Sequence, residues 1–130
     1  MDDDQRARVE RFRRERQRQN TRILEAGHLG INRFFNLDEA AYRESALCAS
    51  TKEMMGLVAS MVLRCNDCID YHLIQCVGLG VSEAELVEAM NVALIVGGSI
   101  VIPHLRHAFD TLDVLLAEQA EGGEPPAPTA

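Results

Sequence analysis

Residues 50–77 read STKEMMGLVASMVLRCNDCIDYHLIQCV and contain the strongest helical signals in the chain. Ser50 and Glu53 form the Ser-x-x-Glu pattern of a capping box, which predicts that a helix begins here. A second helix is expected over residues 66–77, because Gly78 and Gly80 follow it and glycine commonly ends a helix. In the first of these helices apolar side chains recur every three or four residues, the spacing of one helix face: Met54, Leu57, Val58, Met61 and Val62.

The helical pattern continues downstream. Ser82 and Glu85 form a second capping box. The helix that follows is expected to turn one apolar face inward: Leu86, Met90, Ala93, Leu94 and Val96. The glycine pair at 97–98 interrupts this helix, and Pro103 suits the first turn of a last helix that reaches about residue 117. Because the connections are short, consecutive helices are expected to form antiparallel hairpins, and the predicted fold class is all-α.

The uneven charge distribution suggests three segments. Residues 1–20 contain seven of the 13 basic residues and five acidic ones. Their glutamates and arginines lie three and four residues apart, so we expect a charged, solvated helical arm; contact of this arm with RNA or a membrane surface is the alternative. Residues 21–118 are expected to form the folded domain, in which Asp38 caps a short helix through residue 46. Residues 119–130, rich in glycine and proline, predict a disordered tail.

Composition limits the class of protein to which the chain can belong. Its 130 residues, 47% of them hydrophobic and 25% charged, fit one soluble globular domain. A net charge of −7, an aromatic content of 5% and the lack of tryptophan argue against general nucleic-acid binding. No run reaches the ~18 apolar residues of a membrane-spanning helix, and no secretory signal opens the sequence. We therefore expect a cytoplasmic protein whose four cysteines are kept reduced.

Cys65, Cys68 and His72 are the residues that indicate chemistry. Their spacing of three and four residues places all of them on one face of the second helix. Both cysteines fall in its first turn, where free backbone N–H groups and the helix dipole stabilise a thiolate. Asp67 and Asp70 act in the opposite sense, because a nearby negative charge raises a thiol pKa. A disulfide across two residues closes a very short loop and adds little stability, so we expect one that forms and breaks during turnover.

Two other interpretations compete with a redox dithiol. The cysteines could be small core residues beside a buried histidine. Cys65, Cys68, His72 and Cys76 could also be four zinc ligands. However, residues 65–76 span about 16 Å of helix, and four side chains spread over that length cannot all form bonds of about 2.0–2.3 Å to one ion. We therefore predict a redox pair and no metal. Cys48 and Cys76 are expected to be small buried side chains. His104 and His107 are expected to be a partly exposed pair on one helix face; binding of a substrate anion or a metal by this pair is the alternative.

Glu53 is the candidate acid partner of His72. If the chain turns near residues 64 and 65, a rise of about 1.5 Å per residue places Glu53 opposite the stretch from His72 to Cys76. A carboxylate, an imidazole and a thiol in that order can form a proton relay, in which the acid orients the histidine and the histidine deprotonates a cysteine. The same glutamate can also serve the capping box of its own helix.

Glu53, Cys65, Cys68 and His72 form the pattern E-x(11)-C-x-x-C-x-x-x-H. This pattern resembles the signature of AhpD-like proteins, relatives of alkyl hydroperoxide reductase D in the carboxymuconolactone decarboxylase superfamily. The resemblance covers roughly residues 23–115. It implies an all-helical AhpD-like fold assembled into homo-oligomers, trimers or hexamers, and a peroxidase or disulfide reductase without an organic cofactor. Asp67 stands where the better-studied peroxidase members carry a histidine directly before the second cysteine, so a slower reaction with peroxide is expected, while dithiol–disulfide exchange stays open.

By the same resemblance, Cys68 attacks the peroxide, Cys65 resolves the sulfenic acid as a disulfide, and Glu53 with His72 relays protons. The electrons would come from a lipoyl or thioredoxin-like donor. Two functions of other classes stay open. One is a lactone decarboxylase of the same superfamily, whose chemistry needs no paired cysteines. The other is a non-enzymatic, oligomeric redox-sensing or scaffold protein whose arginine-rich arm binds a partner.

Overall fold

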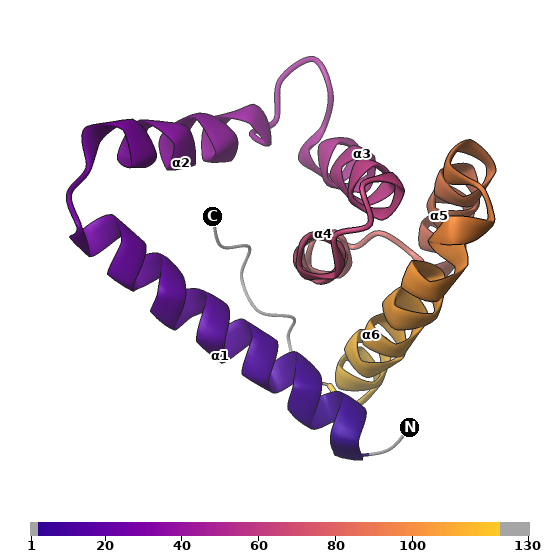
Figure 1. The fold of residues 1–130 in the computed structure, drawn as a ribbon. Coiled ribbons are helices and arrows are strands. Elements are labelled where there is room, and N and C mark those ends of the chain that lie inside the picture. Colours follow the sequence, from indigo (N-terminus) through magenta and orange to yellow (C-terminus); the bar gives the residue numbers. More distant parts are fainter. Residues whose placement is uncertain (1–2, 123–130) are drawn as a thin grey trace.

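The computed structural model describes residues 3–122, and the regular secondary structure in that range is entirely helical. Helices α3 to α6 pack together, while α1 lies against α6 and α2 connects α1 to α3 at the edge of the molecule (Figure 1). The all-α prediction is confirmed. The elements are α1 (Asp3–Glu25), α2 (Leu29–Ala41), α3 (Ala49–Val62), α4 (Asn66–Gly78), α5 (Glu83–Gly97), the short 3₁₀ helix η1 (Ser99–Val101) and α6 (Ile102–Ala120).

The hydrophobic core lies between α3, α4, α5 and α6. Burying an aliphatic side chain of the size found here contributes about 1.5–3 kcal/mol, so this core holds the four helices against one another. Each helix contributes at least two residues with no exposed surface, among them Leu57 and Met61 from α3, Ile69 and Leu73 from α4, Leu86 and Met90 from α5, and Ala108 and Leu112 from α6.

The predicted helix boundaries after residue 62 agree closely with the structure. Helix α4 spans Asn66–Gly78. The capping box of α5 is present, because the Glu85 N–H donates to the Ser82 hydroxyl at 3.1 Å and the Ser82 N–H donates to the Glu85 carboxylate at 2.9 Å. Gly98, with a φ of +80°, follows the end of α5, and Pro103 lies in the first turn of α6.

The capping box predicted for α3 is wrong. The helix begins directly after Cys48, which is its N-cap, and Ser50 lies inside the first turn. The Glu53 carboxylate is buried and hydrogen-bonded to His72. It therefore does not accept a hydrogen bond from a backbone N–H at the start of the helix, as a capping box would require.

The short helix predicted over residues 38–46 is also wrong. The observed helix is α2, Leu29–Ala41, and Asp38 lies inside it instead of capping it. Its N-cap is His28, whose ring nitrogen Nδ1 accepts a hydrogen bond from the Ile31 N–H at 3.3 Å. A histidine ring can replace the side-chain oxygen of the usual capping residues because its unprotonated nitrogen is an acceptor.

Helix α1 is longer than the predicted arm and is only partly solvated. It continues to Glu25, and its first half packs against α6. Val9 is buried with 1% of its surface exposed, and Phe12 packs against the core. Arg13 forms an ion pair with Glu118 at 3.0 Å. The prediction of a solvated arm is wrong for this half, because two apolar residues one turn apart suffice to anchor an otherwise charged helix.

The predicted tail begins later than expected. Helix α6 includes residues 119 and 120, and Glu121 forms an ion pair with Arg6 of α1. The rest of the predicted tail, residues 123–130, lies outside the described residues. None of the helices in residues 3–122 is long and apolar enough to cross a lipid bilayer.

Candidate functional site

Cys65 and Cys68 lie where the chain enters α4. Cys65 is the N-cap of this helix, and its Sγ accepts a hydrogen bond from the Cys68 N–H at 3.3 Å. The two cysteines, with Cα atoms 5.3 Å apart, form a disulfide. The turn before them holds Arg64 at a φ of +62°, a conformation that costs a non-glycine residue about 1–3 kcal/mol. Cys68 is exposed and Cys65 is half-buried, so Cys68 is the more accessible of the two.

His72 and Glu53 form a buried imidazole–carboxylate pair. Nδ1 of His72 lies 2.7 Å from Oε2 of Glu53, and the two residues expose only 8% and 4% of their surface. An ionised carboxylate can only accept a hydrogen bond, so Nδ1 donates here and Nε2 is left as the acceptor nitrogen. The hairpin of α3 and α4 thus joins two residues 19 positions apart in the sequence, as their helical spacing predicted.

Gly56 makes room for the His72 ring. A Cβ atom at this position would lie 2.5 Å from Cε1 and 2.8 Å from each ring nitrogen, well inside van der Waals contact. Glycine in the middle of a helix costs about 1 kcal/mol relative to alanine. Its presence in α3 therefore has a steric reason, which is the close approach of the imidazole. Sequence reasoning missed Gly56, although a glycine inside an apolar helical stretch was a signal for it.

Two tyrosines flank the His72 ring. The ring centroids of Tyr42 and Tyr71 lie 5.4 and 5.1 Å from that of His72, and the Arg16 guanidinium lies 4.1 Å from the centroid of Tyr71. Burial, assisted by the charge of Glu53, raises the pKa of Tyr71 to about 12. The Tyr71 hydroxyl therefore stays protonated at neutral pH. Tyr71 directly precedes His72 in α4, whereas Tyr42 follows α2 and Arg16 belongs to α1, so the sequence held no spacing signal for the contacts of these two residues.

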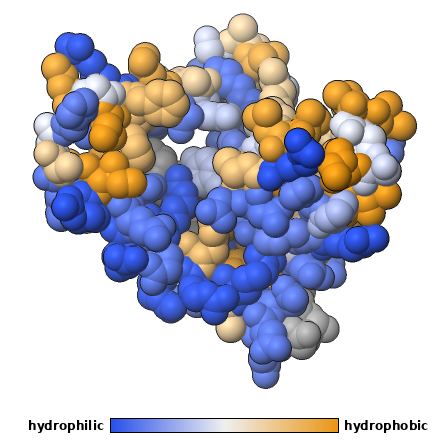
Figure 2. Space-filling view, in the orientation of Figure 1, coloured by the Kyte–Doolittle hydropathy of each residue, from blue (hydrophilic) through white to orange (hydrophobic). Residues whose placement is uncertain are grey.

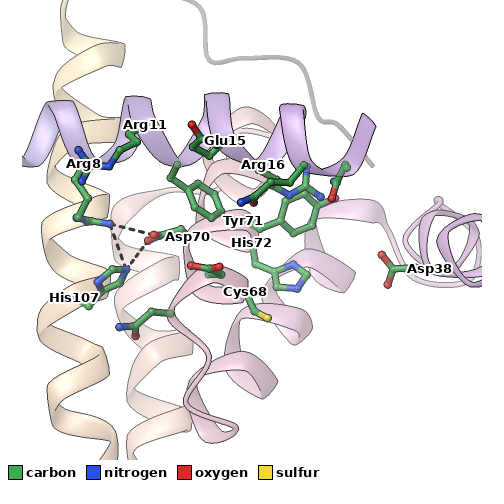
Figure 3. A pocket seen from close by; sticks show the side chains of 15 residues that line it. Arg8, Arg11, Glu15, Arg16, Asp38, Cys68, Asp70, Tyr71, His72 and His107 are labelled. Atoms are coloured by element: carbon green, nitrogen blue, oxygen red, sulfur yellow. Dashed lines mark hydrogen bonds and ion pairs between the residues drawn. The ribbon is translucent and has the colours of Figure 1, made fainter. Parts of the chain in front are cut away.

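A cleft of about 760 Å³ opens between α1 and α4 (Figure 3). Cys68 and His72 lie side by side on its α4 wall, and arginines of α1 lie across from them (Figure 3). This volume is in the range of small-molecule sites and exceeds what hydrogen peroxide alone would need. Helix α1 contributes seven lining residues: Arg8, Arg11, Phe12, Glu15, Arg16, Gln19 and Asn20.

Asp70 holds α1, α4 and α6 together at one end of this cleft. It is 3% exposed and lies 3.1 Å from Nη1 of Arg8 and 2.9 Å from Nε2 of His107 (Figure 3). The Thr111 hydroxyl donates to it at 2.6 Å. Two potential cations and a hydroxyl donor thus surround the buried carboxylate, and the expected effect of Asp70 on the thiol pKa stays a prediction. Asp67, which is exposed and lines the cleft, has none of these partners. His107, which is partly exposed as expected, is part of this cluster.

The other two cysteines differ from each other. Cys76 is fully buried, as predicted, and burial raises its pKa to about 12. The prediction that Cys48 is buried is wrong, because the N-cap position leaves it exposed. Its Sγ lies 3.3 Å from the Ser50 hydroxyl and 3.0 Å from that of Thr51, and hydrogen bonds from these groups lower its pKa to about 7. Cys48 is therefore an exposed thiol that a thiol assay has to take into account.

The histidines of α6 have protein partners. Nδ1 of His104 lies 2.8 Å from Oδ1 of Asn66, and His107 contacts Asp70. Over residues 3–122, no three His, Cys, Asp or Glu side chains are grouped in a way that could hold a metal ion.

The model of the carboxymuconolactone decarboxylase family matches residues 31–111, more than half of the sequence. The chain belongs to the carboxymuconolactone decarboxylase family. Two crystal structures of a family member from Thermotoga maritima are similar to it. One is 52% identical over 86% of this chain and 95% of that chain, with a TM-score of 0.83. The other is 53% identical over 87% and 98%, with a TM-score of 0.82.

For the Thermotoga maritima protein, involvement in an antioxidative response has been suggested. A carboxymuconolactone decarboxylase family protein from Legionella pneumophila, 24% identical over 85% of this chain and 96% of that chain, shares the fold with a TM-score of 0.72. None of the curated proteins is significantly similar to this chain.

Proposed function

We propose that this carboxymuconolactone decarboxylase family protein is a dithiol oxidoreductase of the AhpD-like type, which reduces a hydroperoxide or a partner disulfide in the cytoplasm. The observation that carries the proposal is the buried Glu53–His72 pair beside the Cys65–Cys68 disulfide, with Cys68 exposed in a cleft. A thiol next to an imidazole that is itself oriented by a carboxylate is the usual arrangement of an activated nucleophile.

In the oxidative half-reaction the Cys68 thiolate attacks one peroxide oxygen. The O–O bond breaks, Cys68 becomes a sulfenic acid, and the other oxygen leaves as an alcohol or water after taking a proton. The Cys65 thiolate then attacks the sulfenic sulfur, which forms the disulfide and releases water. Nε2 of His72 accepts the thiol proton and returns it to the leaving oxygen, while Glu53 holds the ring through Nδ1. A dithiol donor of the lipoyl or thioredoxin type then returns two electrons to the disulfide.

Three further arguments support this proposal over its rivals. The relative from Thermotoga maritima, for which an antioxidative role has been suggested, is about half identical to this chain over most of its length. A lactone decarboxylase needs acid–base groups but no paired thiols, so that reaction leaves Cys65 and Cys68 without a function. A scaffold protein, in turn, has no need of a buried Glu53–His72 pair at the end of a cleft.

The test uses single-cysteine variants in a Cys48→Ser background, since Cys48 is itself reactive. After one equivalent of hydroperoxide, Cys65→Ser should retain a sulfenic acid on Cys68 that dimedone labels and mass spectrometry detects. Cys68→Ser should leave Cys65 largely unlabelled, because Cys65 is half-buried and farther in the sequence from His72. Equal labelling of the two variants would contradict the assigned roles, and labelling of neither would contradict peroxidase activity.

We also propose that the protein is a homo-oligomer, a trimer or a hexamer. None of the residues of α2 is buried, and Phe34 and Leu37 expose 69% and 70% of their surface. On α5, Ile95 and Val96 expose 77% and 68%. In Figure 2, apolar residues gather over α2 at the upper left and over α5 at the right. Exposed apolar faces of this kind favour association. Light scattering should give a multiple of 14.4 kDa; a monomer mass at micromolar concentration would contradict this.

A further inference from the structure

Helix α1 carries two sets of arginines that point in different directions. The first set contacts the rest of the protein: Arg6 pairs with Glu121, Arg8 with Asp70, Arg13 with Glu118, and Arg16 lies over Tyr71. The second set is exposed and occupies positions three and four residues apart, which places it on one face of the helix. We call this second set the arginine stripe: Arg11, Arg14, Arg18 and Arg22.

The arginine stripe takes little part in holding the fold. Among residues 3–122, Arg11, Arg14 and Arg22 form no ion pair, and Arg18 pairs only with Glu15 of the same helix. The stripe extends over about 16 Å, at about 1.5 Å per residue. Its cationic groups are therefore available to a partner, and the stability of the chain does not explain their number.

The stripe borders the cleft that holds Cys68. Arg11 belongs to both, since it also lines the cleft, and the next turn of α1 contributes Glu15 to the same lining. Figure 3 shows Arg11 on α1, across the cleft from the α4 wall that carries Cys68 and His72. A molecule bound along the stripe therefore meets the rim of this cleft at Arg11.

The charge of the rest of the chain determines what kind of partner fits. Residues 3–25 contain eight arginines and five acidic residues, whereas the remainder contains five basic and 15 acidic residues. An extended polyanion such as nucleic acid would reach beyond the stripe and meet this acidic remainder. A protein with a compact acidic patch would meet only the stripe, and opposite charges of this kind increase association rates and fix orientation.

We propose that the arginine stripe is the docking surface for an acidic electron-donor protein, whose dithiol reduces the Cys65–Cys68 disulfide. This inference rests on the function proposed above. A thiolate of the partner attacks Sγ of Cys68, the S–S bond breaks, and Cys65 leaves as a thiolate that takes a proton. The second partner thiol then displaces Cys68 from the mixed disulfide. The partner is oxidised to a disulfide and the protein is reduced to its dithiol by two electrons.

The test compares two synthetic peptides in the reduction of the oxidised full-length protein. Both carry one Cys-x-x-Cys dithiol; in one it is flanked by six glutamates and in the other by six glutamines. The rate constants are read by alkylation and mass spectrometry in 20 mM salt. The acidic peptide should react about three- to tenfold faster, with that advantage lost in 0.5 M salt, as expected for exposed ion pairs.

Two triple variants of equal charge change separate docking from net charge. Arg11→Gln with Arg14→Gln and Arg22→Gln should reduce the ratio of the two rate constants to about one. The matched control replaces three exposed arginines away from α1, Arg33, Arg43 and Arg106, by glutamine and should keep the ratio of the unmodified protein.

Three results would overturn the inference. One is an equal rate for both peptides with the unmodified protein, and another is an equal loss of the ratio in both triple variants. The third is tighter stripe-dependent binding of a single-stranded oligonucleotide than of the acidic peptide, which would assign the stripe to nucleic acid. Failure of both peptides, with dithiothreitol still reducing the protein, would overturn reduction by a protein dithiol and with it the docking, whereas failure of the dimedone labelling described above would overturn the proposed peroxide reduction.

Discussion

The Gly56→Ala substitution tests whether the close packing of α3 against His72 is what positions the imidazole. The added methyl group would lie 2.5 Å from Cε1 and 2.8 Å from both ring nitrogens. Carbon atoms in contact prefer separations of about 3.5–4.0 Å, so the ring must move by about 1 Å. That movement breaks or lengthens the 2.7 Å contact between Nδ1 and Glu53.

The expected effects on stability and on activity differ in kind. Alanine improves the helix propensity of α3 by about 1 kcal/mol. A weakened hydrogen bond to the buried Glu53 carboxylate costs about 1.5–3 kcal/mol, so the free energy of unfolding should fall by no more than about 2 kcal/mol. Activity should fall much further, because a displacement of about 1 Å in a catalytic group costs on the order of 100-fold in rate.

The assay is the rate of sulfenic acid formation on Cys68 in the Cys48→Ser, Cys65→Ser background, measured at pH 7 and again at pH 9.5. The loss caused by Gly56→Ala should be large at pH 7 and small at pH 9.5, where hydroxide supplies the thiolate without help from His72. Met55→Ala, at the neighbouring exposed position of α3, is the control and should react like the parent. A Gly56→Ala variant that reacts within twofold of the parent at pH 7 would refute the positioning argument.

Two other predictions follow from the charges around the site. Asp70→Asn should lower the free energy of unfolding by about 2–4 kcal/mol in chemical denaturation, because it leaves Arg8 and His107 without their carboxylate. The exposed Asp67→Asn should change stability by less than about 0.5 kcal/mol, and equal effects of the two would contradict the assigned cluster. Alkylation of Cys48 should reach half its maximal rate near pH 7, the pKa of its thiol. Ser50→Ala should move this midpoint upward, because it removes a donor to the thiolate; an unchanged midpoint would contradict that cause.

Much of the fold was predictable because its signals are local. The Ser82–Glu85 capping box, Pro103 in a first turn and the glycine pair at 97–98 each depend on neighbouring residues, and each lies where it was predicted. The Glu53–His72 contact was predictable for a related reason. Two helices joined by a short turn leave only the rise per residue to decide which side chains meet.

The remaining site residues were not predictable in this way. Arg8, Asp70 and Thr111 come from α1, α4 and α6, and their meeting depends on how three helices pack around the core. The same dependence explains two errors. The sequence around Glu53 suits a capping box, but its carboxylate bonds to His72 of α4 instead. Cysteine is usually a buried residue, but Cys48 is exposed because it lies at the start of a helix.

The most direct test of the dithiol mechanism is the number of reactive thiols in native Cys48→Ser protein before and after oxidation. Cys76 is fully buried and should not react with a coloured disulfide reagent, so the reduced protein should show two thiols, those of Cys65 and Cys68. One equivalent of a hydroperoxide should remove both together and give an intramolecular disulfide, which a dithiol then restores to two thiols. Two thiols that survive excess hydroperoxide, or the loss of only one, would contradict a Cys65–Cys68 pair that works as a peroxide-reducing dithiol.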